Sequence, residues 1–387
     1  MIRKFTFPAT LVTVALVLAA CGSSVPSGAL ESVPDAEGEL NLVVWGGYAD
    51  KSTTDTTDDW ALGFEDATGC TVNAQPMIDS ADGVHLLQSG QYDGGSFSGD
   101  ATLRLIAGGD VAPVNLDLIP NYADVFDTLK GQTHNTVDGV PYGVPHGFGA
   151  NVLLYNTDTF ADAPTTWDSI WDPNSPAAGK ISIYNGPIFI ADAALRLKTT
   201  NDNEFGIDDP YQLNEEQFNA AVALLQEQNA IVGEYWGYAT DQITSFGAGD
   251  MLAGSSWQYQ ANNLPDAPVA ATKPDDYATG WSDTWMIATN AAHPGCMYRW
   301  MDWIISPEVN AEATIWFGEA PVSQAACDAA EELSPGHCVS YHATDAAYWE
   351  GVWFWSTPRE DCNDTDEATT CKSFEDWINA WLEITGA

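Results

Sequence analysis

Basic side chains are scarce in this chain of 387 residues, which has 12 Lys and Arg against 55 Asp and Glu and a formal net charge of −43. Binding of nucleic acid needs a basic surface, so the composition excludes that class of function. An acidic surface is also repelled by anionic lipids, which argues against direct membrane docking. The carboxylates are scattered over the whole sequence, so we expect most of them to form a solvated acidic surface. A field that attracts cationic ligands is the alternative.

Catalytic and metal-binding motifs are also missing. The sequence has six His and contains neither H-E-x-x-H nor G-x-S-x-G. The Gly- and Ser-rich stretch 94–99 has Phe97 at the central place of a nucleophile elbow, so we expect a flexible loop there. No C-x-x-C pair occurs, which argues against a zinc site. The sequence therefore predicts no enzyme, no metal site and no cofactor.

The apolar run that opens the chain is too short to span a membrane. Arg3 and Lys4 precede it, and it extends over residues 5–20. It ends in small residues directly before Cys21, a pattern that resembles the bacterial lipobox; a plain signal peptide followed by an incidental Cys is the alternative. We predict a lipoprotein signal peptide over residues 1–20, acylation of Cys21, and a lipid-anchored flexible tether over residues 21–38. The protein would be exported and would touch the membrane only through this anchor.

Six cysteines remain after Cys21, an even number that in an exported chain suggests disulfides. Six cysteines allow about fifteen pairings, so the sequence alone leaves the connectivity open. Closeness along the chain favours the pairs Cys327–Cys338 and Cys362–Cys371, which would leave Cys70 with Cys296.

Short apolar runs alternate with helical patterns, which predicts an α/β fold with mainly parallel sheets. Asn214 and Gln217 form a capping-box pattern, and Pro307 suits the first position of another helix. Ser373 is expected to cap a last helix. The predicted buried face of that helix consists of Phe374, Trp377, Ile378 and Trp381.

Short motifs follow one another in a fixed order along the mature chain. They are Leu40–Tyr48, Tyr92–Asp93 with Ser98–Asp100, Tyr142–Pro145 with Asn151–Asn156, Thr166–Trp167 with Gly179–Lys180, Gly254–Trp257, Trp281–Asp283 and Phe317–Val322. Each motif alone is weak, but the ordered set resembles the extracellular solute-binding proteins of the spermidine/putrescine type. The resemblance implies a two-lobed α/β fold of the type II periplasmic-binding-protein class, with the ligand in a cleft between the lobes.

The resemblance also implies domain boundaries and a binding site. Lobe one would comprise residues 39–145 plus 284–322, and lobe two residues 146–283 plus 323–387. Trp45 and Tyr48 would form one aromatic wall, Trp257 and Trp281 the facing wall, and Asp283 would pair with an amine. The full implied ligand-binding set is Trp45, Tyr48, Ser98, Asp100, Trp257, Trp281, Asp283 and Glu319. With 16 Trp in the chain, core packing is the alternative for each tryptophan.

The chain departs from the family pattern in lobe two. The stretch 184–189 lacks the acids that usually hold amine nitrogens, and Asp192 further along is expected on the following helix. Asp100 and Glu319 stand where the family commonly has tyrosines. Either the carboxylates are redistributed for a different amine, or the ligand is not a polyamine. His146 is expected to be a hinge residue bonded to backbone, with ligand contact as the alternative.

Two hypotheses for the function share one role. In the first, a lipid-anchored monomer captures a small organic cation, best matched by a polyamine, and delivers it to an ABC permease and its ATPase. In the second, the ligand is a sugar, a neutral osmolyte or an amino-acid-type molecule. Three or more carboxylates converging in the cleft would favour the cation. A surface adhesin would share the anchor but predicts no enclosed cleft.

Overall fold

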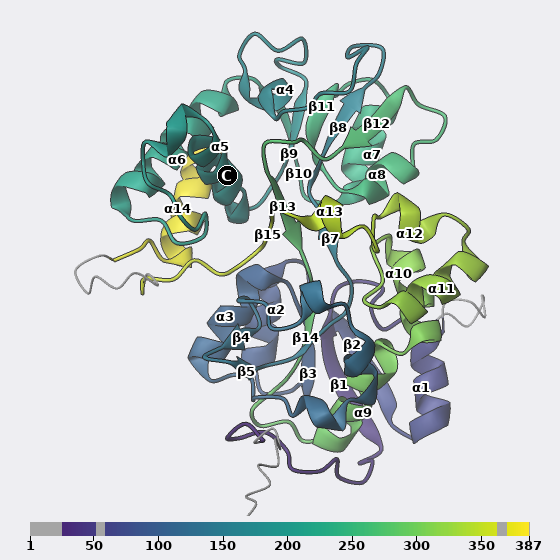
Figure 1. Ribbon diagram of the computed structural model, residues 1–387. Helices are drawn as coiled ribbons and strands as arrows, with labels where there is room; N and C mark the ends of the chain where they lie inside the picture. The colour runs from purple at the N-terminus through teal and green to yellow at the C-terminus, as the bar shows by residue number, and fades with distance from the viewer. Residues whose placement is uncertain (1–24, 52–58, 362–369, 387) are drawn as a thin grey trace, which may run out of the picture.

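The protein consists of two α/β lobes that lie on either side of a short three-stranded sheet (Figure 1). This computed structural model describes residues 25–51, 59–361 and 370–386. The predicted signal peptide, Cys21 and Cys362 lie outside the described residues. The predicted two-lobed α/β fold is confirmed, and the short middle sheet connects the lobes.

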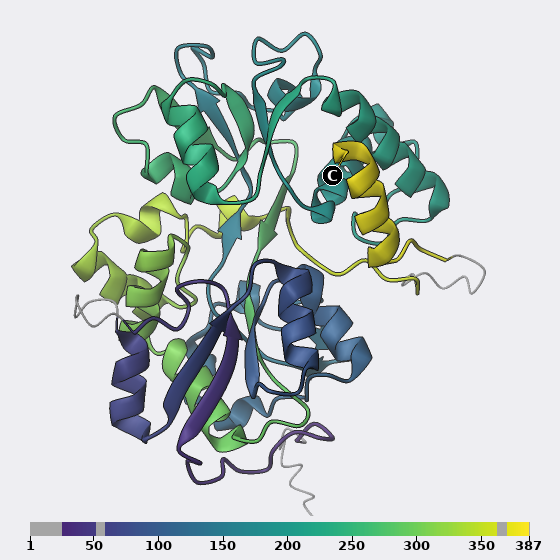
Figure 2. The same cartoon turned by 180° about the vertical axis from the view of Figure 1, so that it is seen from behind.

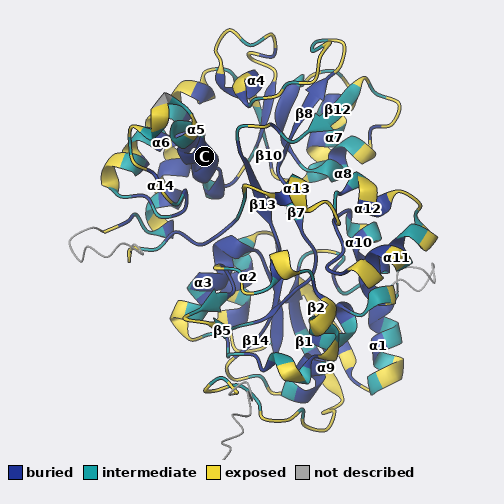
Figure 3. Ribbon diagram, in the orientation of Figure 1, coloured by how far each residue is buried: buried dark blue, intermediate teal, exposed yellow. Residues whose placement is uncertain are grey.

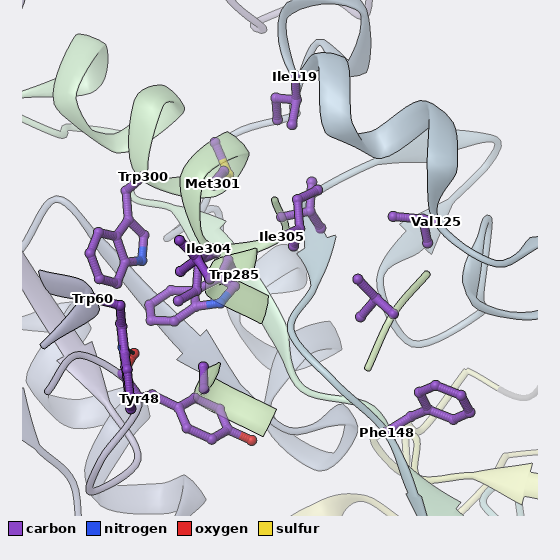
Figure 4. Close-up of a cluster of buried hydrophobic side chains, with 14 of the residues drawn as sticks. Tyr48, Trp60, Ile119, Val125, Phe148, Trp285, Trp300, Met301, Ile304 and Ile305 are labelled. Atoms are coloured by element: carbon purple, nitrogen blue, oxygen red, sulfur yellow. Dashed lines mark hydrogen bonds between the residues drawn. The ribbon is translucent and has the colours of Figure 1, made fainter. Parts of the chain in front are cut away.

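Lobe one is a three-layer structure around a sheet of order β2-β1-β3-β14-β6. Its strands are β1 (Glu39–Val44), β2 (Thr71–Pro76), β3 (Gly94–Phe97), β6 (Val144–Pro145) and β14 (Thr284–Ile287), and its main helices are α1 (Trp60–Thr68), α2 (Ser80–Gln88), α3 (Gly99–Gly108), α9 (Pro294–Ile304) and α10 (Pro307–Phe317). Successive residues of a strand point to opposite faces. Leu42 and Val44 accordingly pack with α1 and α9, whereas Val43 packs with α2 and α3. Figure 4 shows the Trp285, Trp300 and Tyr48 side chains in the first of these two clusters.

Lobe two repeats the arrangement with strand order β10-β9-β11-β8-β12. Its strands are β8 (Val152–Asn156), β9 (Ile181–Tyr184), β10 (Val232–Trp236), β11 (Ala253–Ser256) and β12 (Val269–Thr272), and its helices are α4 (Asp168–Trp171), α5 (Ile190–Thr199), α6 (Glu215–Asn229), α7 (Ala239–Gly247), α8 (Gln258–Asn262) and α14 (Phe374–Thr385). Leu153 faces the cluster of α5, α6 and α14, and Leu154 faces Phe246 of α7. The C-terminal helix α14 is visible against this lobe in Figure 2.

Both large sheets are mixed, but four of the five strands in each run in the same direction, so the sheets are mainly parallel as predicted. Strand β1 runs parallel to β2 and β3, but β14 is antiparallel to β3 and β6. Strand β9 runs parallel to β10 and β11, but β8 is antiparallel to β11 and β12. The reversed strands β8 and β14 are those that enter their lobe directly from the middle sheet, and this entry sets their direction.

Three crossing segments form the middle sheet, here called the hinge sheet. It consists of β7 (Gly149–Ala150), β13 (Ala278–Trp281) and β15 (Val352–Phe354). Strand β13 lies in the middle, antiparallel to β7 and parallel to β15. The segments that cross at β7 and β13 are largely buried, as Figure 3 shows by their dark blue colour. Each large sheet is therefore linked directly to a strand of the hinge sheet.

The remaining short elements connect these layers. They are the hairpin β4 (Thr136–Val137) and β5 (Val140–Pro141), the helices α11 (Gln324–Leu333), α12 (His337–Ser340) and α13 (Ala346–Trp349), and the 3-10 turns η1 (Leu116–Leu118), η2 (Pro120–Asp124), η3 (Asp127–Leu129), η4 (Pro187–Phe189) and η5 (Asn201–Asn203). Residues 324–349 were expected in lobe two. Instead, Cys327 and Ala330 of α11, Tyr341 and Trp349 join the hydrophobic cluster of lobe one, because the buried face of α11 packs on α10. The other lobe boundaries stay a prediction.

Part of the predicted flexible tether packs against lobe one. Both carboxylate oxygens of Glu37 accept hydrogen bonds from the first N–H groups of α9, at Gly295 and Cys296, each 2.9 Å long. These N–H groups have no partner within their own helix, so the carboxylate caps it. Leu30 and Val33 pack against the hydrophobic core. The tether prediction is therefore corrected for the stretch 30–37.

The glycine-rich stretch 94–99 is a buried strand rather than the predicted flexible loop. It forms β3 in the centre of the sheet and the start of α3. A Cβ atom on Gly95 would lie 2.3 Å from the carbonyl oxygen of Val43, and one on Gly94 would lie 2.3 Å from that of Met286. The neighbouring backbone therefore excludes any larger residue at these positions. This close approach of the strands, rather than mobility of the chain, explains the glycines.

Two predicted disulfides are confirmed, Cys70–Cys296 and Cys327–Cys338. Cys371 is also disulfide-bonded, and its expected partner Cys362 lies outside the described residues. The first bridge ties the start of β2 to α9 across 226 residues, whereas the second closes a separation of 11 residues. A longer closed loop removes more entropy from the unfolded chain.

We expect the two bridges to contribute unequally to stability. The Cys70→Ala/Cys296→Ala protein should lose about 2–5 kcal/mol of unfolding free energy, and Cys327→Ala/Cys338→Ala should lose less, because its loop is shorter. Denaturant unfolding of both double variants beside the parent protein measures the difference. A larger loss from the short-loop pair would contradict this account.

Candidate functional site

A cluster of hydrogen-bonded polar side chains lies where lobe one meets the hinge sheet. Asp283 sits between β13 and β14, Ser98 follows β3, and Tyr48 lies in the loop after β1. Tyr48 Oη donates to Asp283 Oδ2 at 2.7 Å, and Ser98 Oγ donates to Asp283 Oδ1 at 2.5 Å. The ends of neighbouring strands at one edge of a sheet bring these residues together. The structure thus unites three of the predicted ligand-binding residues.

Glu319 joins this cluster from the end of α10. Its Oε2 lies 3.3 Å from Tyr48 Oη, so the tyrosine contacts both acids. The helix ends at Gly318 with φ of 87°, a left-handed conformation that favours glycine and turns the chain inward. A Cβ atom on Gly147 would lie 2.3 Å from the Glu319 carboxyl carbon, so the acid packs tightly against the crossing segment.

His146 packs against this cluster without supplying a positive charge. Trp285 Nε1 donates to His146 Nδ1 at 3.0 Å, and His146 Nε2 lies 3.3 Å from Glu319 Oε1. Although that distance is short enough for an ion pair, burial lowers the pKa of His146 to about 3 and raises the pKa of Glu319 well above its usual range. His146 is therefore neutral at pH 7 and supplies no positive charge to Glu319. The main-chain N–H of His146 donates to Asp283 O, and its carbonyl oxygen accepts from Asn310 Nδ2. The ring itself contacts the side chains of Trp285 and Glu319 rather than the backbone that was expected.

The acids of the cluster are costly to ionise. Burial raises the pKa of Asp283 to about 6, although the hydrogen bonds from Ser98 and Tyr48 lower it. Burial also raises the pKa of Asp100 to about 6, while the Ser80 hydroxyl and the Arg104 charge oppose the shift. Within the described chain, no Lys or Arg forms an ion pair with Asp283 or Glu319. Asp283 and Glu319 are thus buried together without a basic partner in the described chain, whereas Asp100 has the Arg104 charge nearby.

Asp100 lies in the first turn of α3, and Ser80 Oγ donates to its Oδ1 at 2.9 Å. The Arg104 guanidinium one turn later lies 4.9 Å from the ring centre of Phe374, on α14 of lobe two. The negative charges of Asp100 and Asp283 also raise the pKa of Tyr184 in lobe two, although burial contributes more. These two acids therefore face the boundary between the lobes.

Aromatic rings form the lobe-two side of the site. Trp257 follows β11 and Trp281 ends β13, with 5.8 Å between their ring centres. Together with Tyr341 and Tyr348 they line a small cavity. A second small cavity also has Trp257 in its lining. It is lined by Asn151, Tyr184, Ile188, Phe189, Asp192, Trp236, Ser255, Ser256, Trp257 and Trp355.

The predicted lobe-one wall is arranged differently from the expectation. The Tyr48 ring is buried against His146 and Phe317, at 3.9 Å and 4.5 Å between ring centres, so it offers its hydroxyl rather than its face. Trp45 is half-buried among the hydrophobic clusters of lobe one, and its indole N–H has no hydrogen-bond partner. A contact of either ring face with a ligand stays a prediction.

The sequence did not single out Tyr184, Trp236 or Trp355. Tyr184 and Trp236 end the neighbouring strands β9 and β10, and Trp355 directly follows β15. Tyr184 was noted from the sequence only as the first residue of the stretch 184–189, which lacks acids. Trp236 and Trp355 belong to segments for which no motif was recognised, so only the folded structure reveals them.

Over the described residues no helix has the length and apolar character needed to cross a membrane. The same part of the chain holds no group of three or more His, Cys, Asp or Glu side chains arranged to bind a metal ion.

Comparison with known proteins places this geometry in a family. The family model described as bacterial extracellular solute-binding protein matches residues 60–334. The chain therefore belongs to the bacterial extracellular solute-binding proteins, a class that carries solutes for transport.

The individual proteins that match this chain are only distantly related to it in sequence. A putrescine/agmatine-binding protein of Pseudomonas aeruginosa is 20% identical over 316 residues, covering 79% of this chain and 83% of its own. The spermidine/putrescine ABC transporter substrate-binding protein PotD of Streptococcus pneumoniae matches in structure with a TM-score of 0.67 at 14% identity, covering 90% of this chain and 98% of its own. MotA of A. tumefaciens B6, solved with glucopine, has a TM-score of 0.65 at 18% identity and covers 90% and 99%. At these identities the structural matches establish the fold alone.

We expect the ligand-free protein to lose stability as the buried acids ionise. The folded-state pKa of Asp283, about 6, lies above the ordinary value of 3.8, so the proton on Asp283 stabilises the fold at low pH. That contribution is lost as the pH rises from about 4 to about 6. Asp283→Asn cannot ionise, so its stability relative to the parent should rise over this range by up to about 3 kcal/mol.

Denaturant unfolding between pH 4 and pH 8 checks this expectation. Asp208→Asn, which neutralises an exposed carboxylate of lobe two, controls for the change in net charge. Parallel stability curves for the parent and Asp283→Asn would show that Asp283 carries no raised pKa.

Proposed function

We propose that the protein is a lipid-anchored solute-binding protein of an ABC importer that captures a polyamine-type organic cation between its lobes. The observation that carries the proposal is Asp283, a carboxylate only 3% exposed, next to Glu319 and with no Lys or Arg in ion-pair contact within the described chain. Burying unpaired carboxylates is costly, and a ligand cation would repay that cost. The number of acids in the cluster supports a cation over a neutral solute.

The aromatic side of the site supports the same ligand chemistry. A polyamine combines ammonium groups with methylene spacers, so it needs carboxylates at its nitrogens and flat apolar surfaces between them. Asp283 and Asp100 would supply charge-assisted hydrogen bonds. Trp257 and Trp281 would supply apolar contact and cation–π attraction of about 0.5–2 kcal/mol each. The polyamine-related names of the Pseudomonas and Streptococcus proteins support this choice.

Ligand contact with both lobes would stabilise the closed state. Asp283 and Asp100 lie with lobe one, whereas Trp257 belongs to lobe two. A ligand that touches both sides gains contacts only when the lobes are together, which shifts the population toward closure. We infer that an ABC permease with its ATPase recognises this closed form and that the protein acts as a monomer.

A polyamine should raise the melting temperature of the tether-free protein. Spermidine at about 100 times its dissociation constant should add about 2.7 kcal/mol of stability. Asp283→Asn should abolish the shift, because it removes the charge that pairs with the ammonium group. A thermal-shift series with spermidine, putrescine, sugars, amino acids and neutral osmolytes provides the measurement.

Asp208→Asn serves as the control and should keep the full spermidine shift. If amines have no effect and a neutral solute raises the melting temperature, the polyamine assignment is wrong and the solute-binding role remains. If Asp283→Asn keeps the spermidine shift, the amine is held elsewhere.

Acylation of Cys21 should hold the full chain at the membrane. In a bacterial host, the full-length protein should fractionate with membranes and carry added lipid mass on its mature N-terminal residue. Cys21→Ser should move to the soluble fraction with no lipid mass, because serine lacks the thiol that is acylated. Fractionation followed by intact-mass measurement distinguishes the two. Membrane retention of Cys21→Ser would contradict the anchor.

A further inference from the structure

The short helix α12 lies between α8 of lobe two and helices α10 and α11 of lobe one (Figure 1). The side-chain amide of Asn262, in α8, donates to Ser340 Oγ, in α12, at 3.0 Å. The ring of Tyr259, also in α8, rests on Gly318 at the end of α10, where a Cβ atom would lie 2.2 Å from its Cδ2 and 3.0 Å from Tyr341 Oη. The end of α10 and helix α12 thus form one continuous surface that α8 contacts.

Helix α12 is also bonded to the acid cluster. His337 Nε2 lies 2.8 Å from the main-chain carbonyl oxygen of Glu319. A carbonyl oxygen only accepts hydrogen bonds, so this nitrogen carries the proton and donates. The Glu319 side chain contacts Tyr48 in the cluster, and α8 begins directly after Trp257. One short helix therefore contacts an acid of lobe one and the helix that starts at the tryptophan wall of lobe two.

The position of α12 is fixed by its links to α11. With four residues it is too short to be stable on its own. The Cys327–Cys338 bridge joins it to α11, whose buried face belongs to the core of lobe one. Both carboxylate oxygens of Glu331, in α11, accept main-chain hydrogen bonds at the start of α12, from Gly336 at 2.6 Å and from Cys338 at 3.0 Å. The surface that meets lobe two is therefore held by the core of lobe one.

We propose that the disulfide-tied helices α11 and α12 form a clasp that receives α8 when the lobes close and thereby sets the affinity of the cleft for its ligand. The inference rests on the proposed function and assigns a role to residues outside the predicted ligand-binding set. A ligand that bridges the lobes binds with an affinity that depends on the population of the closed state. The contacts between the clasp and α8 involve protein atoms alone, so they favour closure whichever solute is bound.

Stability and affinity should respond differently to the two disulfides. Cys70 directly precedes β2, so its bridge lies at the amino end of the sheet, opposite the site. That bridge closes the longer loop and should contribute more to the free energy of unfolding. The Cys327–Cys338 bridge spans only 11 residues but holds the surface that contacts lobe two. A purely structural role predicts the same order of the two bridges for stability and for affinity, whereas the clasp predicts opposite orders.

Hydrogen exchange of the ligand-free full chain tests the clasp without any solute. Cys327→Ala/Cys338→Ala should speed the exchange of residues 258–263 about threefold to thirtyfold, because α8 loses hydrogen bonds and packing from across the boundary. These residues lie in the other lobe, so a local change in α12 alone would not affect them. Cys70→Ala/Cys296→Ala removes the same number of cysteines and should leave the exchange of this segment unchanged.

Calorimetric titration with spermidine tests the effect on affinity. Cys327→Ala/Cys338→Ala should bind spermidine about threefold to thirtyfold more weakly than the parent, and Cys70→Ala/Cys296→Ala should bind it equally well. Tyr259→Ala removes the ring that rests on Gly318 from the lobe-two side and should cause a similar loss. The three substitutions together should cost less than the two separate losses combined, because both changes act on one contact.

Two substitutions of His337 test the link to the acid cluster. His337→Phe lacks the N–H donor and should weaken spermidine binding about threefold to tenfold, the usual effect of one lost hydrogen bond. His337→Gln keeps a side-chain N–H and should retain more of the affinity. The melting temperature of each ligand-free variant shows whether it is folded.

The outcomes separate the clasp from the wider function. Faster exchange confined to residues 324–341 in the Cys327→Ala/Cys338→Ala protein, with residues 258–263 unchanged, would overturn the clasp. Parent-like spermidine affinity in this variant, or fully additive losses with Tyr259→Ala, would also overturn it. If the parent does not bind spermidine, the polyamine assignment fails, and the exchange of residues 258–263 still decides whether the clasp exists.

Discussion

A single stretch of chain, residues 278–287, belongs first to the hinge sheet and then to the sheet of lobe one. Strand β13 pairs with β7 and β15, and three residues later β14 pairs with β3 and β6. The passage between the two sheets places Trp281 toward the aromatic side of the site and Asp283 in the acid cluster. Because both strands are held by hydrogen bonds on each side, the positions of these two residues are fixed by the fold itself. The rest of the site is built around that passage.

The electrostatics of the site follow from the burial of acids that, apart from Asp100 with Arg104 nearby, have no compensating basic side chain in the described chain. The chain carries 55 acids, and most of them can remain in water at little cost. Asp283, Glu319, Asp100 and Asp192 differ because they are buried, and burial raises the pKa of each. In a stable scaffold such groups would be paired with Arg or Lys, or replaced by apolar residues. Their retention at the boundary of the lobes is typical of a binding site whose missing cation comes from the ligand.

Local sequence patterns predicted those elements whose signals are local. The Asn214–Gln217 capping box and the Ser373 cap are present, and Pro307 is the first residue of α10. The face of α14 was only partly predicted: Ala380 and Ile384 are buried, whereas Ile378 is only half-buried. A regular stripe of apolar residues predicts that a helix forms. Which of its residues are most buried depends on the side from which the neighbouring elements pack, and that is set by the tertiary structure.

Features that depend on contacts distant in sequence could not be predicted in this way. The direction of β14 is set by its entry into lobe one from the hinge sheet. The glycines of β3 are required because the backbone of β1 and β14 lies too close to them for a side chain. Both arise from topology, for which a single sequence carries little signal.

The acids of lobe two illustrate the same limit at the level of function. Along the sequence, stretch 184–189 shows a loss of carboxylates, which counts against a cationic ligand. In the fold, Asp192 lines the cavity that Tyr184 and Trp236 enclose. It can do so because it lies in the first turn of α5, whose start immediately follows η4. An acid placed one helical turn further along can thus serve the same cavity, since residues three or four apart share a helix face. A comparison of positions in sequence records only the missing acids, whereas the fold shows a buried acid, Asp192, in the lining of a cavity next to this stretch.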